Sequence, residues 1–147
     1  MRKRLVLVLL GLSGCHRGEL VRLQVVNDSQ EKLVDIAVFC DGKRLADTLV
    51  PKYRSPADRL NYYLRLPPGP HRIVALSQGQ HTRLDTSLNT TGSNVLGVTF
   101  RYDSLAPRHQ KTYFADGAEG EITFPAFHIP RRFRVYQFQT AQPLRPE

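Results

Sequence analysis

Apolar and polar residues alternate in short runs along most of the chain after residue 19. A period of two is typical of β-strands that bury one face, and glycine and proline interrupt the runs about every ten residues. No apolar pattern at helical spacing persists over several turns. The pattern therefore predicts an all-β fold, a single antiparallel β-sandwich of about eight to nine short strands after an N-terminal signal segment.

A two-residue turn is predicted at Asp41 and Gly42, because glycine accepts the positive φ that such turns require. The strands over 33–40 and 43–50 then form a hairpin. The strand over 19–28 precedes them closely, so the three strands are expected to form a meander.

Gln78 and Gly79 predict a second two-residue turn. That turn places Leu76 opposite His81 and leaves His71 about five rungs farther along the hairpin, roughly 17 Å away. We therefore expect no site that joins the two histidines.

Alternation also assigns side chains to the core or the surface. Cys40 shares a face with the apolar residues of its strand and is expected to be a buried thiol, with no histidine near it in sequence to act as a base. Tyr62 and Tyr63 must point to opposite faces. Phe133 and Val135 are expected on one face of their strand, opposite Arg134 and Tyr136. Two segments without alternation are interpreted as a turn and a loop, at 27–29 and 103–110.

The chain opens with a basic head, Arg2 to Arg4, followed by the apolar run Leu5 to Leu12 and the small residues Ser13 and Gly14. This is the layout of a secretory signal peptide. As a helix, the run rises about 12 Å at about 1.5 Å per residue, far short of the roughly 30 Å hydrocarbon core. A permanent membrane span is not expected.

The residues Leu12 to Cys15 resemble the lipobox of bacterial lipoproteins, a branched apolar residue and two small ones before the cysteine. The resemblance implies lipidation of Cys15, cleavage before it, and acyl chains such as palmitate that hold the protein on a membrane of the cell envelope. With His16 rather than aspartate next, it favours the outer membrane if the organism has two. An ordinary cleaved signal and a first strand with an accidental cysteine are the alternatives.

The predicted organisation is a signal peptide over 1–14, a lipid-anchored tether over 15–19, one sandwich domain over 20–140 and a flexible tail over 141–147. The precursor has 21 basic and 13 acidic residues, and removal of the signal leaves 18 basic ones. This moderate positive charge favours contact with anionic headgroups, lipopolysaccharide or acidic glycans, although a solvated surface explains it equally well.

The strand Val38–Gly42 ends in Asp-Gly, and about twenty-five residues later Leu66–Ile73 contains a Pro-Gly corner followed by a histidine. In this arrangement residues 20 to 80 resemble the small transthyretin-like and PEGA-type β-sandwich modules of bacterial envelope proteins. The resemblance implies a sandwich and brings no functional residues with it.

The residues suited to catalysis or metal binding are scattered. None of the histidines has the paired spacing of a zinc site; they are His16, His71, His81, His109 and His128. The carboxylates between Asp116 and Glu121 lack the spacing of an EF-hand and are interpreted as a solvated turn. Gly-x-Ser-x-Gly and phosphate-binding glycine loops are absent from the sequence. We expect no enzymatic activity, no metal and no cofactor.

The densest cluster of aromatic and cationic residues lies between residues 52 and 63, before and along a strand expected over 59–66. An exposed tyrosine beside an arginine can stack on a sugar or on a partner's side chain. The candidate ligand-binding residues are Tyr53, Arg54, Arg59 and Tyr63. Cross-strand packing is the alternative explanation for the tyrosines. A second basic group, Arg131, Arg132 and Arg134, is interpreted as a solvated strand face.

The sequence therefore predicts a lipid-anchored envelope lipoprotein that acts as a binding or structural module, with another envelope protein or an anionic glycan as partner and no nucleic acid. Two alternatives stay open: an accessory subunit of an envelope secretion or transport assembly, and a small hydrolase whose site forms only in the fold. A groove with Tyr53 or Tyr63 beside Arg54 or Arg59 would favour glycan binding. An exposed apolar patch would favour assembly, and a cleft joining histidine, carboxylate and hydroxyl would favour the hydrolase.

Overall fold

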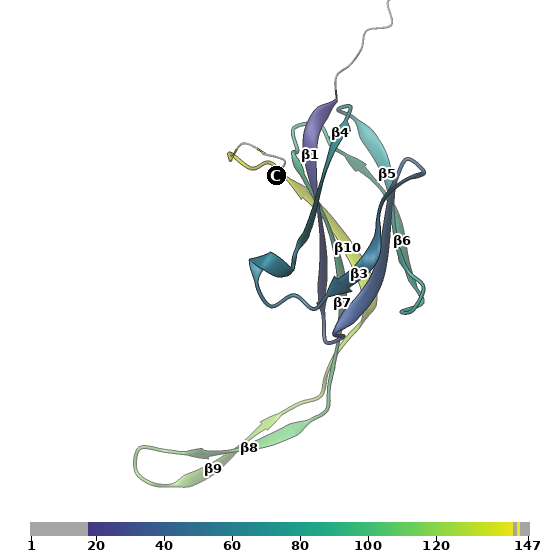
Figure 1. The fold of residues 1–147 in the computed structure, drawn as a ribbon. Helices are drawn as coiled ribbons and strands as arrows, with labels where there is room; N and C mark the ends of the chain where they lie inside the picture. Colours follow the sequence, from purple (N-terminus) through teal and green to yellow (C-terminus); the bar gives the residue numbers. More distant parts are fainter. Residues whose placement is uncertain (1–17, 143, 145–147) are drawn as a thin grey trace, which may run out of the picture.

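The computed structural model describes residues 18–142 and 144 (Figure 1). The predictions for the signal peptide, for Cys15 and for most of the tail concern residues outside this range. The described residues form an all-β sandwich of two packed four-stranded sheets, with a separate two-stranded arm.

Sheet A has the strand order β10-β7-β1-β4, with the bounds β10 (Phe127–Phe138), β7 (Val95–Leu105), β1 (Glu19–Ser29) and β4 (Leu60–Leu66). Sheet B has the order β3-β2-β5-β6, with the bounds β3 (Lys43–Pro51), β2 (Leu33–Cys40), β5 (Pro70–Ser77) and β6 (Thr82–Asn89). A short 3₁₀ turn, Pro56–Asp58, lies between β3 and β4. The arm consists of β8 (Arg108–Tyr113) and β9 (Glu119–Phe124).

The core lies between the two sheets and is built from the alternate apolar positions of their strands. Cys40 is buried there, as its alternation predicts. Tyr62 packs against the core and Tyr63 points outward, which confirms their predicted opposition. Phe133 is also buried and meets Phe100 edge to face, with 5.4 Å between the ring centroids. Burial of this alternating set drives the sandwich to close.

The predicted meander is wrong because β1 does not pair with β2. It lies in the middle of sheet A, antiparallel to β4 and parallel to β7. Asn27, expected in a turn, is fully buried inside β1, where its side chain donates hydrogen bonds to the carbonyl oxygens of Val50 (3.2 Å) and Glu31 (3.1 Å). Satisfying these buried carbonyls allows a polar residue to continue the strand.

The turn between β5 and β6 is longer than predicted. Ser77 pairs with Thr82 instead of Gln80, so the whole register moves by two residues. Asp35 on β2 accepts the backbone N–H groups of Gln78 (2.8 Å) and Gly79 (3.1 Å) and the Ser77 hydroxyl (2.6 Å). A carboxylate from the neighbouring strand therefore holds a wider turn open.

The segment 103–110, expected to be a loop, is largely strand. The β7 strand continues to Leu105, which pairs with Phe127 at the start of β10, and β8 begins at Arg108. The arm leaves the sandwich at the end opposite to the start of β1 and turns to one side (Figure 1).

Candidate functional site

The outward face of sheet A, called here the sheet A face, gathers basic side chains from all four strands and from the loop before β4. Strand register places Arg132 beside Arg101, and Arg101 beside Asp28. The basic residues of the face are Arg22, Lys52, Arg59, Arg65, Arg101, Arg132 and Arg134. Asp28 and Asp103 are its acidic residues. The basic residues before β4 and those on β10 are far apart in the sequence, but they lie on this one surface.

Tyr53 stands at the edge of this face and is held from both sides. Its backbone N–H donates to the carbonyl oxygen of Asn27 on β1 (2.8 Å). The guanidinium of Arg59 lies 5.1 Å from the centroid of the Tyr53 ring and donates from Nη2 to the Tyr53 hydroxyl oxygen (2.9 Å). The cation and the aromatic ring therefore form one positioned unit.

The loop between Tyr53 and Arg59 is ordered by Asp58. Its carboxylate accepts the backbone N–H groups of Arg54 (2.9 Å) and Ser55 (2.8 Å). These two hydrogen bonds are the main reason that the pKa of Asp58 lies below its usual value. These hydrogen bonds hold the loop that precedes Arg59 in place, although none of the residues Pro56–Asp58 is buried.

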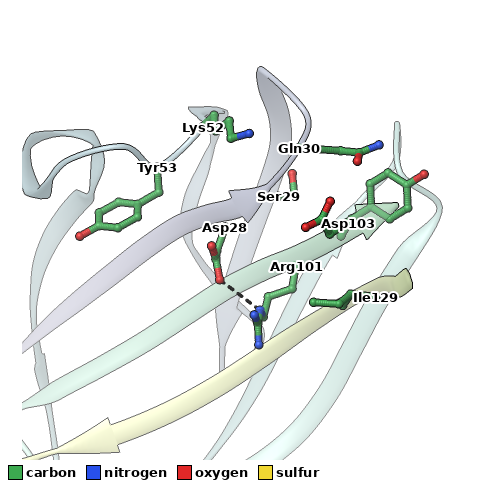
Figure 2. Close-up of a pocket in the computed structure, with 9 residues that line it drawn as sticks. Asp28, Ser29, Gln30, Lys52, Tyr53, Arg101, Asp103 and Ile129 are labelled. Carbon is green, nitrogen blue, oxygen red and sulfur yellow. Dashed lines mark ion pairs between the residues drawn. The ribbon is translucent and has the colours of Figure 1, made fainter. Parts of the chain in front are cut away.

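Two adjoining pockets lie beside Tyr53, and both are lined by Tyr53 and Asp28. Together we call them the Tyr53 groove. The first, about 220 Å³, has a floor of Val26 and Thr99 between Tyr53, Arg59 and Tyr136. The lining of the second, about 160 Å³, includes Asp28, Lys52, Tyr53, Arg101, Asp103 and Ile129. Figure 2 shows the ion pair of Asp28 and Arg101 within this lining, with Lys52 and Tyr53 on the neighbouring loop. The Arg101 Nε lies 3.1 Å from the Asp28 carboxylate.

The far wall of the groove is aromatic. Tyr136 on β10 lies over Gly97, where any Cβ would collide with its ring. The ring of Tyr136 is also nearly parallel to that of Phe138, with 6.1 Å between centroids. The glycine lets the tyrosine lie flat against the sheet, so an exposed π-face borders the basic residues.

No family model, no curated protein and no solved structure matches the chain. Among the described residues, none of the helical segments is long and apolar enough to cross a membrane.

Of the four candidate ligand-binding residues, the structure brings two together. Tyr53 and Arg59 line the same pocket. Arg54 is exposed on the other side of the loop, in a pocket with Asp58. Tyr63 belongs to the sheet A face but lies at the other end of β4, paired in register with Arg22.

Sequence reasoning missed Asp28, Arg101 and Tyr136 as groove residues. Alternation along β10 did place Tyr136 on the same face as Arg134. Alternation does not reveal that β10 pairs with β7 and that β7 pairs with β1. This strand pairing brings Arg101 and Tyr136 close to Tyr53.

A second cluster joins Cys40, Asp41 and His71, whose ligand atoms lie within 4.8 Å of one another. His71, distant in sequence, is therefore close to the thiol after all. Both of its nitrogens are occupied, Nδ1 by Asp41 (2.6 Å) and Nε2 by the carbonyl oxygen of Pro67 (2.8 Å). Burial and the adjacent Asp41 charge raise the pKa of the Cys40 thiol to about 11. The thiol thus has no free base and is a poor nucleophile.

The same geometry argues against a metal in this cluster as it stands. Two ligands bound at about 2.0–2.1 Å in a tetrahedral site lie roughly 3.3 Å apart. The 2.6 Å between Asp41 and His71 is instead the length of a charge-assisted hydrogen bond. The cluster clamps the corner before β5 to the β2–β3 turn.

One further group places a histidine near a carboxylate and a hydroxyl. His109 Nδ1 lies 3.3 Å from Glu121 and 3.1 Å from the Thr123 hydroxyl. These residues lie on the arm, where the side chains of His109 and Glu121 are each 61% exposed. An open hairpin surface does not exclude water, so it lacks the enclosed cleft that a hydrolase site requires.

Proposed function

We propose that this protein is a lipid-anchored envelope lipoprotein, with a transthyretin-like or PEGA-type sandwich, that binds an anionic glycan on its sheet A face. The anchor in this proposal is Cys15, and the support for it is the lipobox pattern of the sequence. The observation that carries the binding function is the Tyr53 groove, where Tyr53 lies under Arg59.

The groove offers the three kinds of contact that an acidic sugar needs. Arg59 and Lys52 supply positive charge, and a guanidinium pairs with carboxylate or phosphate groups through two parallel hydrogen bonds. Tyr136 supplies a flat π-face on which a sugar ring can stack. Asp28 is half exposed beside Arg101 and can accept hydrogen bonds from sugar hydroxyls. Excess basic charge favours an acidic over a neutral glycan.

We expect Arg59→Gln to reduce binding of polygalacturonate, used as an anionic glycan probe, by about tenfold, because one charge-assisted contact is lost. Arg54→Gln is the matched control, since it removes the same charge from the same loop outside the groove. Isothermal titration calorimetry of the full-length protein in detergent measures both. Equal losses in the two variants, or equal binding of neutral dextran, would contradict the proposal.

The anchor has a separate test. Cys15→Ser is expected to move the protein from the membrane pellet to the soluble fraction, because the acyl chains supply the membrane affinity. Cys40→Ser serves as the control, since Cys40 is buried in the core and should not affect partitioning. A Cys15→Ser protein that stays with the membranes would show that the anchor lies elsewhere.

The runner-up, an accessory subunit of an envelope assembly, has its own supporting observation. The arm carries exposed apolar side chains, among them Phe114 and Ile122. Such a surface fits contact with protein rather than with a glycan.

A further inference from the structure

The arm is a two-stranded sheet on which no other layer packs. Its strands β8 and β9 pair only with each other. A lone hairpin is marginally stable in water, and it becomes stable when an apolar face is covered. We therefore expect another surface to cover one face of the arm.

Strand register divides the arm into two different faces. Arg108 pairs with Phe124, and Gln110 with Ile122, so these side chains share one face. Phe114, at the tip, lies over Gly120 on the same face. The opposite face carries the charged or titratable residues His109, Lys111, Glu119 and Glu121, together with Thr123 and the exposed Tyr113. The first face is thus the more apolar one and the second the more charged one.

The apolar face is open to solvent. Ile122 is 46% exposed and Phe114 is 57% exposed. Phe124 is partly covered by the guanidinium of Arg108, which lies 4.6 Å from the ring centroid. A contiguous exposed apolar face of this kind marks an interaction site.

Charge along the arm identifies what covers it. The basic Arg108 lies at the base, and the acidic Asp116 lies in the turn at the tip. A second arm laid antiparallel on the first sets each base against the other's tip, so opposite charges meet. A parallel arrangement would set like charges together. The arm is therefore complementary to another copy of itself.

We infer that two copies of this chain associate through their arms, apolar face against apolar face and base against tip, about a two-fold axis. An interface of this kind is isologous and closes as a dimer. The arm turns to one side of the sandwich (Figure 1). If the two-fold axis runs along the sandwich, the start of β1 lies at the same end in both copies, and two copies on one membrane pair without inverting either.

The test uses the full-length protein in a density-matched detergent, with mass measured by sedimentation equilibrium. We expect a dimer for the unaltered chain. Ile122→Arg should raise the dissociation constant by a hundredfold or more, since it places a charge in the apolar contact. Thr123→Arg introduces the same charge one residue away on the opposite face and should leave the dimer intact. A monomeric unaltered chain, or equal effects of the two variants, overturns the inference.

The base-to-tip arrangement has its own measurement. Arg108→Gln and Asp116→Asn, singly and together, form a double-mutant cycle on the dissociation constant; asparagine keeps the side-chain acceptor that Asp116 offers to Ala118. Within one copy the two residues lie at opposite ends of the arm, roughly 20 Å apart at about 3.3 Å per residue. Coupling between them is expected only across the dimer. Purely additive effects would overturn the antiparallel arrangement.

Discussion

Replacing Asn27 with leucine is expected to lower the free energy of unfolding by about 2–4 kcal/mol, because buried polar groups left without a partner cost roughly 1–3 kcal/mol each. The amide of Asn27 is fully buried. It links β1 to the end of β3 through Val50 and accepts the Ser29 hydroxyl (2.6 Å). Leucine fills a similar space but bonds to none of these groups. Urea denaturation measures the loss.

Asn61→Leu is the matched control, since Asn61 is exposed on β4 and its side chain only accepts a 3.3 Å hydrogen bond from Gln24. We expect a change within about 0.5 kcal/mol for this variant. The Asn27 variant should also weaken glycan binding, because the backbone of Asn27 holds Tyr53 in place. Equal stability losses in the two variants would show that the buried amide is not the link between the sheets.

The stability of the protein is expected to fall as the pH rises above neutrality, and His71 is the reason. Both partners of its ring, Asp41 and the carbonyl oxygen of Pro67, are acceptors, so the bound ring carries a proton on each nitrogen. Burial opposes this charge, but the two hydrogen bonds outweigh it, and the pKa of His71 lies above its ordinary value of 6.5. The folded state therefore binds this proton more tightly than the unfolded state.

The sign of the pH dependence follows from that difference. The contribution of His71 is complete below about pH 6.5 and is lost as the pH rises through the raised pKa of the folded state. Asp41 determines part of the pH dependence of stability at low pH. The hydrogen bond from His71 is the first reason that its pKa is lowered from 3.8, so its contribution is lost as the pH falls below that value. The pair stabilises the fold most between these limits.

His71→Gln should therefore cost about 1.5–3 kcal/mol near pH 6, the range of hydrogen bonds to charged groups, and should flatten the stability profile between pH 6 and 9. His81→Asn is the control, because His81 is exposed in a turn with φ of 49°, a conformation that asparagine accepts. Denaturation across this pH range measures both. An NMR titration that places the His71 pKa at or below 6.5 would refute the explanation.

The sandwich and much of its core were predictable from alternation, because a period of two depends only on neighbouring residues. Cys40 was assigned to the core in this way, Tyr62 was placed opposite Tyr63, and Phe133 was placed opposite Arg134. The β5–β6 turn was not predictable, because its length depends on Asp35, a residue more than forty positions away. The parallel pairing of β1 with β7 was not predictable either, because no pattern in the sequence of either strand indicates its partner.

The same distinction applies to the site. Tyr53 and Arg59 are six residues apart, and their pairing follows from local loop geometry. Arg101 and Tyr136 join them only through the strand order of sheet A. The continuation of β7 towards the arm was also hidden, since Pro107 lies in the segment 103–110 that was interpreted as a loop.

The position of β1 in the middle of sheet A sets the order in which the molecule can fold. This strand comes first from the ribosome, yet one of its two neighbours, β7, is synthesised about seventy residues later. Such separation makes the nucleus non-local, and chains of this kind fold in milliseconds to seconds rather than microseconds. β4 can cover one edge of β1 earlier, but the other edge stays unpaired until β7 is made, and an unpaired strand edge is open to contact with other chains.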